Sequence, residues 1–236
     1  MKSVLVTGGT VRLGAAIAAR LRADGWRVIT SSHRADAGAD IVADLAEPME
    51  AAKLYAATLQ LLDGNPPDAL VNNAALFVGD AATLRSVNFD APKKLTMMMA
   101  GRETGVGAVV NILDSAAGDS SETRTPRETR TSSGTSQASL AYLETKRELR
   151  AFTLSSAMMF AASLRVNGVA PGPVLAPTDV HEKAGAMLLD RRPTPEDVAA
   201  AVAYLLAAEA VTGVVLPVDA GQHLVDATFP SRSEAL

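Results

Sequence analysis

Cysteine is absent from this sequence, and histidine occurs only three times, at the widely separated positions 33, 181 and 223. Without cysteine the chain can have neither a disulfide-stabilised scaffold nor a thiolate metal site. Three scattered histidines also lack the clustered spacing of a histidine metal site. We therefore expect no bound metal.

Long apolar runs and an excess of basic charge are missing too. No apolar stretch approaches the roughly 18 residues that a membrane-spanning helix needs. A predicted core strand follows Met1 at once, so we expect no signal peptide. The net charge is -4, and the only dense basic cluster lies between Arg124 and Arg130, which argues against nucleic acid or an acidic membrane as partner. We expect a soluble, cytoplasmic protein that acts on a small-molecule substrate.

Alternating strand and helix patterns fill most of the 236 residues. Strand patterns occur at residues 2–6, 27–30, 39–43, 69–71, 108–113, 164–169 and 214–218, and helical patterns at 15–23, 48–62, 83–99, 137–162 and 195–208. This alternation predicts an α/β fold: a doubly wound parallel sheet of the Rossmann type, with about seven strands and helices on both faces. Residues 31–38 are too few for a crossover helix, so we expect only a turn there.

A single domain over residues 1–236 is expected, because this length supports one well-buried core. The one compositional break is the polar run 119–136, which has too few apolar residues to offset its ordering entropy. We interpret this run as an insertion at the rim of the site. It is either a disordered surface loop or a basic flap whose Arg124, Arg127 and Arg130 attract an anionic tail of the substrate.

The stretch from Thr7 to Gly14, TGGTVRLG, lies between the first predicted strand and the first predicted helix. Glycines at such a junction let backbone N–H groups approach a phosphate, and the helix N-terminus adds partial positive charge at the same point. The stretch therefore predicts a dinucleotide site. Arg12 stands where a glycine is often found.

Tyr142 and Lys146 are four residues apart on a predicted helix, which places them on one face, one turn apart. A phenol with a reference pKa of about 10 becomes a useful proton donor near neutral pH when neighbouring positive charge lowers that pKa. The alternative is a surface tyrosine beside a solvated lysine. The catalytic interpretation of the pair is favoured, because the pair follows a sheet of the nucleotide-binding type.

Taken in order, these segments resemble the short-chain dehydrogenase/reductase family over almost the whole chain. The resemblance rests on the glycine turn, on Asn72-Asn73-Ala74 after the fourth strand, on the Tyr/Lys pair and on Pro171-Gly172 after the sixth strand. It implies that Tyr142 donates a proton, that Lys146 binds the nicotinamide ribose and acidifies the phenol, and that Asn88 holds a water of the proton relay. The cofactor-binding residues that it implies are Thr7, Gly8, Arg12, Leu13, Gly14, Ser32, His33, Arg34, Asp44, Leu45, Asn73, Ala74, Ala75, Lys146, Pro171, Gly172 and Val174.

Asp114 occupies the position where this family usually has its catalytic serine. An ionised carboxylate only accepts hydrogen bonds, whereas a hydroxyl can donate one to a ketone oxygen. Asp114 therefore suits a substrate rich in N–H groups, or one that needs a second proton from a protonated acid. A carboxylate beside Tyr142 would raise the pKa of the phenol, so Lys146 has more to offset. The alternative is that Asp114 only closes a turn and Ser115 supplies the hydroxyl.

Ser32, His33 and Arg34 follow the second strand, where an NAD-specific protein would carry an acidic residue for the ribose hydroxyls. A guanidinium can form two parallel bonds to the extra 2′-phosphate of NADP(H). We therefore expect NADPH as the cofactor. An ordinary polar turn is the alternative.

Within the family, the chain resembles the pteridine reductases through Arg12, His33-Arg34, the Asp114-Tyr142-Lys146 set and Phe77. That resemblance implies that Arg12 contacts cofactor phosphate and pterin, and that Phe77 covers the substrate, although phenylalanine is also a common core residue. The substrate-binding residues that it implies are Arg12, Phe77, Asp114 and Tyr142.

The activity that this implies is NADPH-dependent hydride transfer to a pterin or dihydropterin, including dihydrofolate, in a homotetramer. Two alternatives stay open: a carbonyl reductase of the same family, acting on 3-oxoacyl groups or sugars, and a catalytically silent NADP(H)-binding protein.

Overall fold

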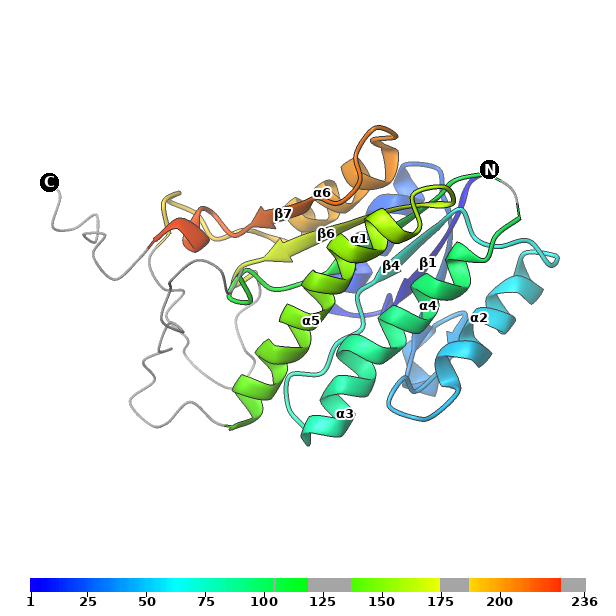
Figure 1. Ribbon diagram of the computed structural model, residues 1–236, viewed down its shortest axis with the longest axis horizontal. Helices are drawn as coiled ribbons and strands as arrows, with labels where there is room; N and C mark the ends of the chain where they lie inside the picture. The colour runs from blue at the N-terminus through cyan, green and yellow to red at the C-terminus, as the bar shows by residue number, and fades with distance from the viewer. Residues whose placement is uncertain (104, 119–136, 175–186, 226–236) are drawn as a thin grey trace, which may run out of the picture.

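The computed structural model describes residues 1–103, 105–118, 137–174 and 187–225, without the side chains of residues 137–139. Seven parallel strands form one sheet in the order β3-β2-β1-β4-β5-β6-β7 (Figure 1). The strands are β1 Ser3–Thr7, β2 Arg27–Ser32, β3 Ile41–Val42, β4 Ala69–Asn72, β5 Gly107–Ile112, β6 Leu164–Pro171 and β7 Val215–Val218. The predicted doubly wound parallel sheet is confirmed.

Helices cover both faces of this sheet. They are α1 Arg12–Ala23, α2 Glu50–Leu61, α3 Ala81–Arg85, α4 Ala91–Ala100, α5 Gln137–Met159 and α6 Pro195–Ala207, with the short turns η1 Ala35–Ala37, η2 Ser86–Asp90 and η3 Gln222–Leu224. Helices α2, α4 and α5 lie on one face, and α1 and α6 pack together on the other (Figure 1). No helix in the described part of the chain is both long enough and apolar enough to cross a membrane.

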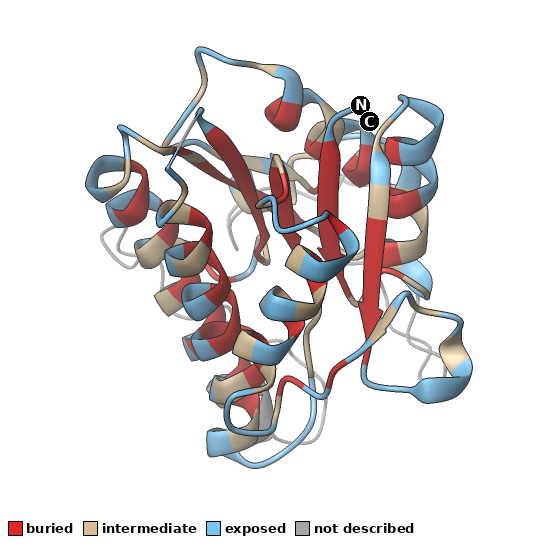
Figure 2. Ribbon diagram, turned by 90° about the vertical axis from the view of Figure 1, so that its right-hand side faces the viewer, coloured by how far each residue is buried: buried red, intermediate tan, exposed pale blue. Residues whose placement is uncertain are grey.

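Two layers of buried side chains hold the helices to the sheet, as the buried strands of Figure 2 show. Leu5 of β1 packs in the layer under α2, α4 and α5, whereas its neighbours Val4 and Val6 pack in the layer under α1 and α6. Successive side chains of a strand point to opposite faces, so a strand covered on both sides needs a continuous apolar run. This requirement explains the sequence of β1.

Several element boundaries differ from the predictions. The predicted helix over residues 83–99 is α3, η2 and α4 in series, and it begins earlier because Asp80 caps it, with Oδ1 accepting from the Thr83 N–H at 2.9 Å. Pro48 is not helical: Met49 has a φ of +67°, and α2 begins only at Glu50.

The predicted strand over residues 39–43 shrinks to β3, because only Ile41 and Val42 pair with β2. The turn expected between these strands is present as η1, without a crossover helix. The polar run 119–136 and His181 lie outside the described residues.

The strand order reverses between β1 and β4. Open parallel sheets bind ligands at such a switch point, beyond the carboxyl ends of the strands. The carboxyl ends of β1, β4, β5 and β6 lie side by side there, and more than half of the site residues predicted from the sequence lie on these strand ends or follow them.

Candidate active site

The glycine turn after β1 is tied to the segment after β4 by four hydrogen bonds. The Thr7 hydroxyl oxygen accepts from the backbone N–H groups of Asn73 and Ala74, both at 3.0 Å. The Asn73 side-chain amide donates to the carbonyl oxygens of Thr7 and Gly8, also at 3.0 Å. Two separate sequence motifs therefore form one rigid unit at the switch point.

Gly14 is buried inside this unit. A Cβ at this position would overlap the Gly8 carbonyl oxygen and lie 2.5 Å from Nδ2 of Asn73. Gly8 itself has a φ of +61°, in the left-handed region that favours glycine. The backbone at both positions must therefore stay free of side chains.

Arg12 is the first residue of α1 and has a φ of +50°. An L-residue with a side chain is strained in this region, which explains why glycine is common at this position of the turn. The Arg12 side chain is exposed, and no hydrogen bond or ion pair within the described residues involves it.

A phosphate-bearing cofactor fits this turn on two further observations. The Thr10 hydroxyl is buried and has no hydrogen-bond partner among the described residues, and a polar atom left in that state requires a partner. The N-terminus of α1 points its backbone N–H groups at the same region.

Tyr142 and Lys146 extend from α5 toward the end of β5. The Tyr142 hydroxyl donates to Oδ2 of Asp114 at 2.9 Å, and the Lys146 ammonium donates to the Ile112 carbonyl oxygen at 2.9 Å. The lysine nitrogen lies 5.8 Å from the centre of the Tyr142 ring. The predicted trio is therefore assembled in one place, although 28 residues separate Asp114 from the tyrosine.

Asp114 also closes a local turn. Its Oδ1 accepts from the Ala116 N–H at 2.8 Å, as aspartates at the start of turns often do. Asp114 thus closes a turn and also accepts a hydrogen bond from the phenol, so turn closure is not its only contact. Ser115 joins the turn through its backbone N–H, which donates to the Pro171 carbonyl oxygen at 2.9 Å.

Burial and mutual charge set the ionisation of this trio. Burial raises the pKa of Tyr142 well above 10, and the Asp114 carboxyl raises it further. Burial also raises the pKa of Asp114, against the opposing effect of its hydrogen bonds. Lys146 is 3% exposed, and burial lowers its pKa to about 8. By themselves, these effects therefore favour a neutral phenol next to a carboxyl whose pKa is raised.

Lys146 has hydrogen-bonding capacity to spare. An ammonium carries three donors, and one of them is used within the described residues. This buried cation has donors left for the hydroxyls of a sugar, and its contact to the nicotinamide ribose stays a prediction.

Asn88 lies in the π-helical turn η2, and both ends of its amide are occupied. Nδ2 donates to the Leu76 carbonyl oxygen at 2.8 Å and to the Thr145 hydroxyl at 3.2 Å, and Oδ1 accepts from the Leu76 N–H at 2.8 Å. Thr145 in turn donates to the Tyr142 carbonyl oxygen at 2.6 Å. Asn88 thus links the segment after β4 to helix α5.

Phe77 follows directly after Leu76, whose backbone N–H and carbonyl oxygen are both bound by the Asn88 amide. Its ring centre lies 4.8 Å from that of Tyr142, with an interplanar angle of 32°. The side chain is 58% exposed, so Phe77 is not a core residue. The Phe77 ring therefore lies beside the phenol and is more than half exposed.

The residues after β2 and β3, which are expected to contact the adenosine part of the cofactor, are partly buried and partly exposed. Arg34 is exposed and pairs with Asp36 through two hydrogen bonds of 2.9 and 2.7 Å, while the Ser32 hydroxyl oxygen accepts from the Arg34 N–H at 3.1 Å. Leu45 is buried in the core, and Asp44 is exposed and accepts from the Ala46 N–H. His33 is exposed as well.

The segment after β6 borders the site at the carboxyl end of the sheet. The Gly172 N–H donates to the Val218 carbonyl oxygen at 3.0 Å, and a Cβ on Gly172 would lie 2.6 Å from that of Asp219. Pro171 is buried, while Leu13 and Val174 pack against the core under α1 and α6. Ala75 is half-buried.

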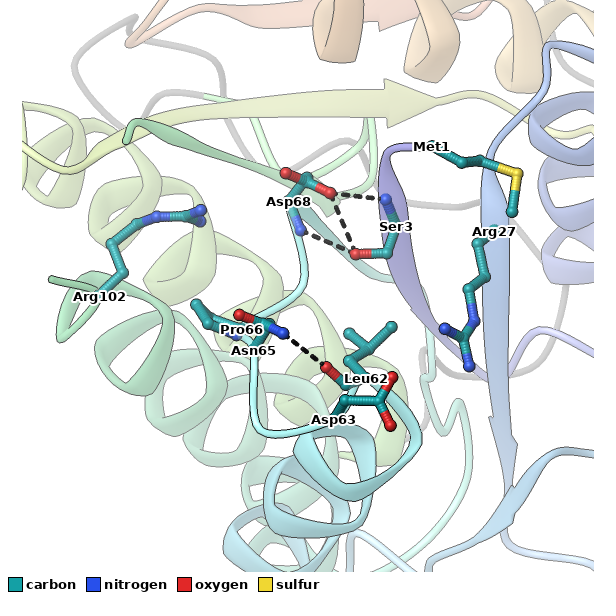
Figure 3. Close-up of a pocket in the computed structure, with 9 residues that line it drawn as sticks. All are labelled: Met1, Ser3, Arg27, Leu62, Asp63, Asn65, Pro66, Asp68 and Arg102. Atoms are coloured by element: carbon teal, nitrogen blue, oxygen red, sulfur yellow. Dashed lines mark hydrogen bonds between the residues drawn. The ribbon is translucent and has the colours of Figure 1, made fainter. Parts of the chain in front are cut away.

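A cavity of about 410 Å³ lies elsewhere in the described part of the chain. It is lined by residues from the amino ends of β1 and β2 and from the loops before β4 and β5 (Figure 3). Asp68 there accepts from the N–H and the hydroxyl of Ser3 at 2.7 and 3.1 Å. This cavity is at the opposite edge of the sheet from Tyr142, so its size does not bear on the chemistry.

The sheet order, the glycine turn and the Tyr/Lys pair together define a class of nicotinamide-dependent oxidoreductases. A family model described as enoyl-(acyl carrier protein) reductase matches residues 11–223. The chain belongs to the short-chain dehydrogenase/reductase family, as its motifs predicted.

Individual relatives cover almost the whole chain. The structure of FolM alternative dihydrofolate reductase 1 from Brucella canis with NADP is similar, with a TM-score of 0.77, 27% identity and 96% of each chain covered. Pteridine reductase 1 from Leishmania tarentolae is 28% identical over 94% of this chain and 96% of its own. A ketoacyl reductase of the granaticin polyketide synthase from Streptomyces violaceoruber is 29% identical over 94% and 96%. The predicted cofactor class, NADP(H), is confirmed by solved relatives that hold it.

Sequence reasoning missed the hydrogen bonds of Thr145 and the buried, unpartnered hydroxyl of Thr10. Thr145 stands between Tyr142 and Lys146, but only its position opposite Asn88 gives it a partner. Thr10 lies within the glycine turn, where the motif draws attention to its neighbours. No local pattern distinguishes either threonine from an ordinary polar residue.

Proposed function

We propose that this protein is an NADPH-dependent reductase of a pterin or dihydropterin, with dihydrofolate among the candidate substrates. The observation that carries the proposal is the set formed by Asp114, Tyr142 and Phe77: a carboxyl 2.9 Å from the phenol and an aromatic ring 4.8 Å from it. A flat heterocycle rich in nitrogen suits an aromatic face next to a proton-donating pair. The likeness to pteridine reductase 1 and FolM agrees with this assignment.

When bound, the cofactor supplies the hydride, and the protein supplies orientation, charge and protons. The glycine turn, the N-terminus of α1 and Lys146 would hold it. Tyr142 gives a proton from its hydroxyl to the substrate, and a protonated Asp114 replaces that proton through their hydrogen bond. The Lys146 ammonium stabilises the phenolate that forms in between.

Asn88 holds Phe77 and Tyr142 in position relative to each other. By binding both backbone polar groups of Leu76, it fixes the residue next to Phe77, and through Thr145 it fixes the Tyr142 backbone. Asn88 acts in this proposal as a positioning residue, in addition to the water-holding role that the family resemblance implies.

A substrate panel tests the proposal. Purified protein is mixed with NADPH and, separately, with biopterin, dihydrobiopterin, dihydrofolate, simple ketones and a 3-oxoacyl thioester, and NADPH oxidation is followed. We expect turnover of at least one pterin with a higher kcat/KM than any carbonyl substrate. Turnover of ketones with none of pterins would overturn the assignment.

Carbonyl reduction is the second candidate, because the granaticin ketoacyl reductase is a relative of similar identity. Tyr142 and Lys146 would serve it equally well. Asp114 favours the pterin, because its carboxyl oxygens can accept hydrogen bonds from the N–H groups of a nitrogen-rich ring, which a simple ketone lacks.

Asp114→Asn tests the second proton donor. An amide keeps the shape but cannot transfer a proton, so we expect kcat for pterin reduction to fall by about 10²-fold or more. NADPH affinity, measured by calorimetry, stays close to wild type. Equal pterin turnover in both proteins would contradict the role of Asp114.

The pH profile supplies a control on the same variant. Asp114 gives up a proton only while protonated, so wild-type activity falls as pH rises through its raised pKa, and it falls again near pH 8 as Lys146 loses its charge. Asp114→Asn removes the first step and moves the second to lower pH, because the carboxylate no longer raises the pKa of Lys146. Removal of the carboxylate also lowers the pKa of Tyr142, because Asp114 raises it.

Arg12 is the proposed link between cofactor phosphate and pterin. Arg12→Gly relieves the left-handed strain and should raise the free energy of unfolding by about 1 kcal/mol. It should also lower kcat/KM for the pterin by about tenfold to a hundredfold, the effect of losing a hydrogen bond to a charged group. Thermal unfolding and steady-state kinetics measure the two effects.

Arg12→Ala is the matched control, because alanine loses the guanidinium but keeps the strain. We expect it to lose turnover like Arg12→Gly without gaining stability. Unchanged pterin turnover in both variants would show that Arg12 only occupies space in the turn.

A homotetramer belongs to the same proposal. Exposed apolar side chains lie on α4 and α5, at Met97, Leu154, Met158 and Met159, and such a surface favours burial against another subunit. Sedimentation equilibrium or light scattering gives the molecular mass directly, and a monomer would contradict this part of the proposal.

A further inference from the structure

The cavity of about 410 Å³ at the amino edge of the sheet has charged side chains of both signs in its wall (Figure 3). Arg27 begins β2 and Arg102 follows α4, while Asp63 and Asp68 belong to the loop between α2 and β4. Small-molecule sites have volumes of about 300 to 1,000 Å³. The cavity therefore has room for a small ligand and polar groups to hold it.

These four charges do not neutralise one another. No ion pair joins either of these arginines to either of these aspartates, all four of which the structure describes. The guanidiniums donate to backbone carbonyl oxygens instead, Arg27 to Leu61 at 2.5 Å and Arg102 to Pro67 at 3.2 Å. Opposite charges that share a cavity without pairing suit a ligand that itself carries both signs.

Arg27 is held in place and keeps donors for such a ligand. A guanidinium has five N–H donors, and the hydrogen bond to Leu61 is the one that the described residues take from this side chain. Two further donors of the same fork can bind a carboxylate through parallel hydrogen bonds. The Arg27 side chain is exposed, so a ligand can approach it.

Asp63 presents a carboxylate at the end of the same helix, α2. Asp63 has a φ of +54° and Gly64 a φ of +85°, and aspartate tolerates this left-handed region better than most residues. The Gly64 N–H donates to the Leu59 carbonyl oxygen at 2.8 Å and the Asn65 N–H to that of Leu62 at 3.0 Å, which fixes the turn. No hydrogen bond or ion pair within the described residues engages the Asp63 side chain. A carboxylate beside a helix C-terminus favours a positively charged group.

Asp68 and Arg102 fasten the wall of the cavity. Oδ2 of Asp68 accepts from the N–H and the hydroxyl of Ser3 at 2.7 and 3.1 Å. The Arg102 guanidinium stands where a Cβ on Gly107 would lie, so it packs against the start of β5. Arg27 and Asp63 are therefore the charged pair that is placed to bind a ligand.

The wall also has an apolar part, which Met1, Leu62 and Pro66 provide. An aliphatic group can pack there and leave water. A free α-amino acid with an aliphatic side chain combines a carboxylate, an ammonium group and such an apolar body in one small molecule.

We propose that this cavity binds a free α-amino acid with an aliphatic side chain, with the carboxylate on Arg27 and the ammonium group on Asp63. The inference is independent of the cofactor and of the pterin, because the cavity lies at the opposite edge of the sheet from Tyr142. The bound ligand joins the starts of β1 and β2 to the loops before β4 and β5. Its binding therefore stabilises the folded chain by mass action.

NMR of the full chain tests the site with three related probes. They are L-leucine, 4-methylpentanoate, which lacks the amino group of leucine, and isopentylamine, which lacks its carboxylate. We expect leucine to shift the amide signals of Ser3 and residues 62–65 and to leave those of Gly8 and Tyr142 unchanged. Leucine should bind at least about tenfold more tightly than either analogue, the effect of one more hydrogen bond to a charged group. Tm should rise with leucine concentration.

Asp63→Asn and Arg27→Gln separate the two halves of the site. Asparagine also tolerates left-handed backbone, and the Asp63 side chain has no partner to lose within the described residues, so this variant keeps the fold. We expect each variant to weaken leucine binding by about tenfold to a hundredfold. Arg20→Gln and Asp24→Asn are the matched controls, because these residues pair with each other outside the cavity, and leucine affinity should stay at the wild-type value.

Several results would overturn the inference. They are an equal affinity for leucine and either analogue, amide shifts away from the cavity, and leucine binding that neither cavity variant weakens. Failure of glycine, L-alanine and L-leucine to shift any cavity signal up to their solubility limits would overturn it as well. If inorganic phosphate bound as tightly as leucine and depended on Arg27, the cavity would be a simple anion site.

Discussion

Replacing Tyr142 by phenylalanine is expected to lower kcat for pterin reduction by about 10²- to 10⁴-fold, the usual contribution of a positioned general acid. The hydroxyl is the group that joins Asp114 to the substrate, and phenylalanine removes it while keeping the ring against Phe77. NADPH affinity should change little, because Lys146 donates to the Ile112 carbonyl oxygen independently of the phenol. Steady-state kinetics and calorimetry measure both quantities.

Tyr204→Phe is the control for this variant. Tyr204 lies on α6 and is 57% exposed, so the loss of its hydroxyl should leave kcat at the wild-type value. If wild type binds NADPH tightly but turns over no substrate, and Tyr142→Phe changes nothing, the protein is a silent NADP(H)-binding sensor or scaffold.

Replacing Gly14 by alanine should have the largest effect on the architecture of the site. The new methyl group overlaps the Gly8 carbonyl oxygen and presses on the Asn73 amide, and overpacking of this kind costs about 2 kcal/mol or more. For a chain of this size such a loss lowers Tm by about 4 to 8 °C. A displacement of about 1 Å in the turn would also reduce turnover by about 10²-fold.

Gly101→Ala provides the comparison for stability. Gly101 ends α4 with a φ of -74°, and a Cβ there would meet only the Met98 carbonyl oxygen, at an ordinary contact distance of 3.5 Å. We expect Tm within the range of wild type and normal NADPH binding. Equal behaviour of the two glycine variants would show that the turn tolerates a side chain and that its rigidity is not needed.

These expectations share a physical basis in burial. Lys146 and Tyr142 are both almost fully buried, and burial alone disfavours the charged ammonium and the charged phenolate. Asp114 adds negative charge, which helps the ammonium and hinders the phenolate. The trio is therefore tuned to keep the phenol protonated until the reaction consumes its proton.

The elements and the motifs follow from the sequence because their causes are local. A continuous apolar run predicts the doubly covered strand β1, and the four-residue spacing of Tyr142 and Lys146 fixes their common helix face. The resemblance to a family then assigns Asp114 to the same site, and the hydrogen bond to Tyr142 agrees with it. The boundaries were less accurate where caps decide them, as at Pro48 and Asp80.

Tertiary structure decided the contacts between elements, because these depend on register and side-chain direction. Only the fold shows that Asn73 braces the glycine turn, that Asn88 reaches Leu76 and Thr145, and that Phe77 lies against the phenol. It also shows that Arg34 faces Asp36 while Arg22 lines a cavity. The sequence by itself determined which chemistry the chain can carry, whereas the packing of helices on the sheet decided which side chains meet to perform it.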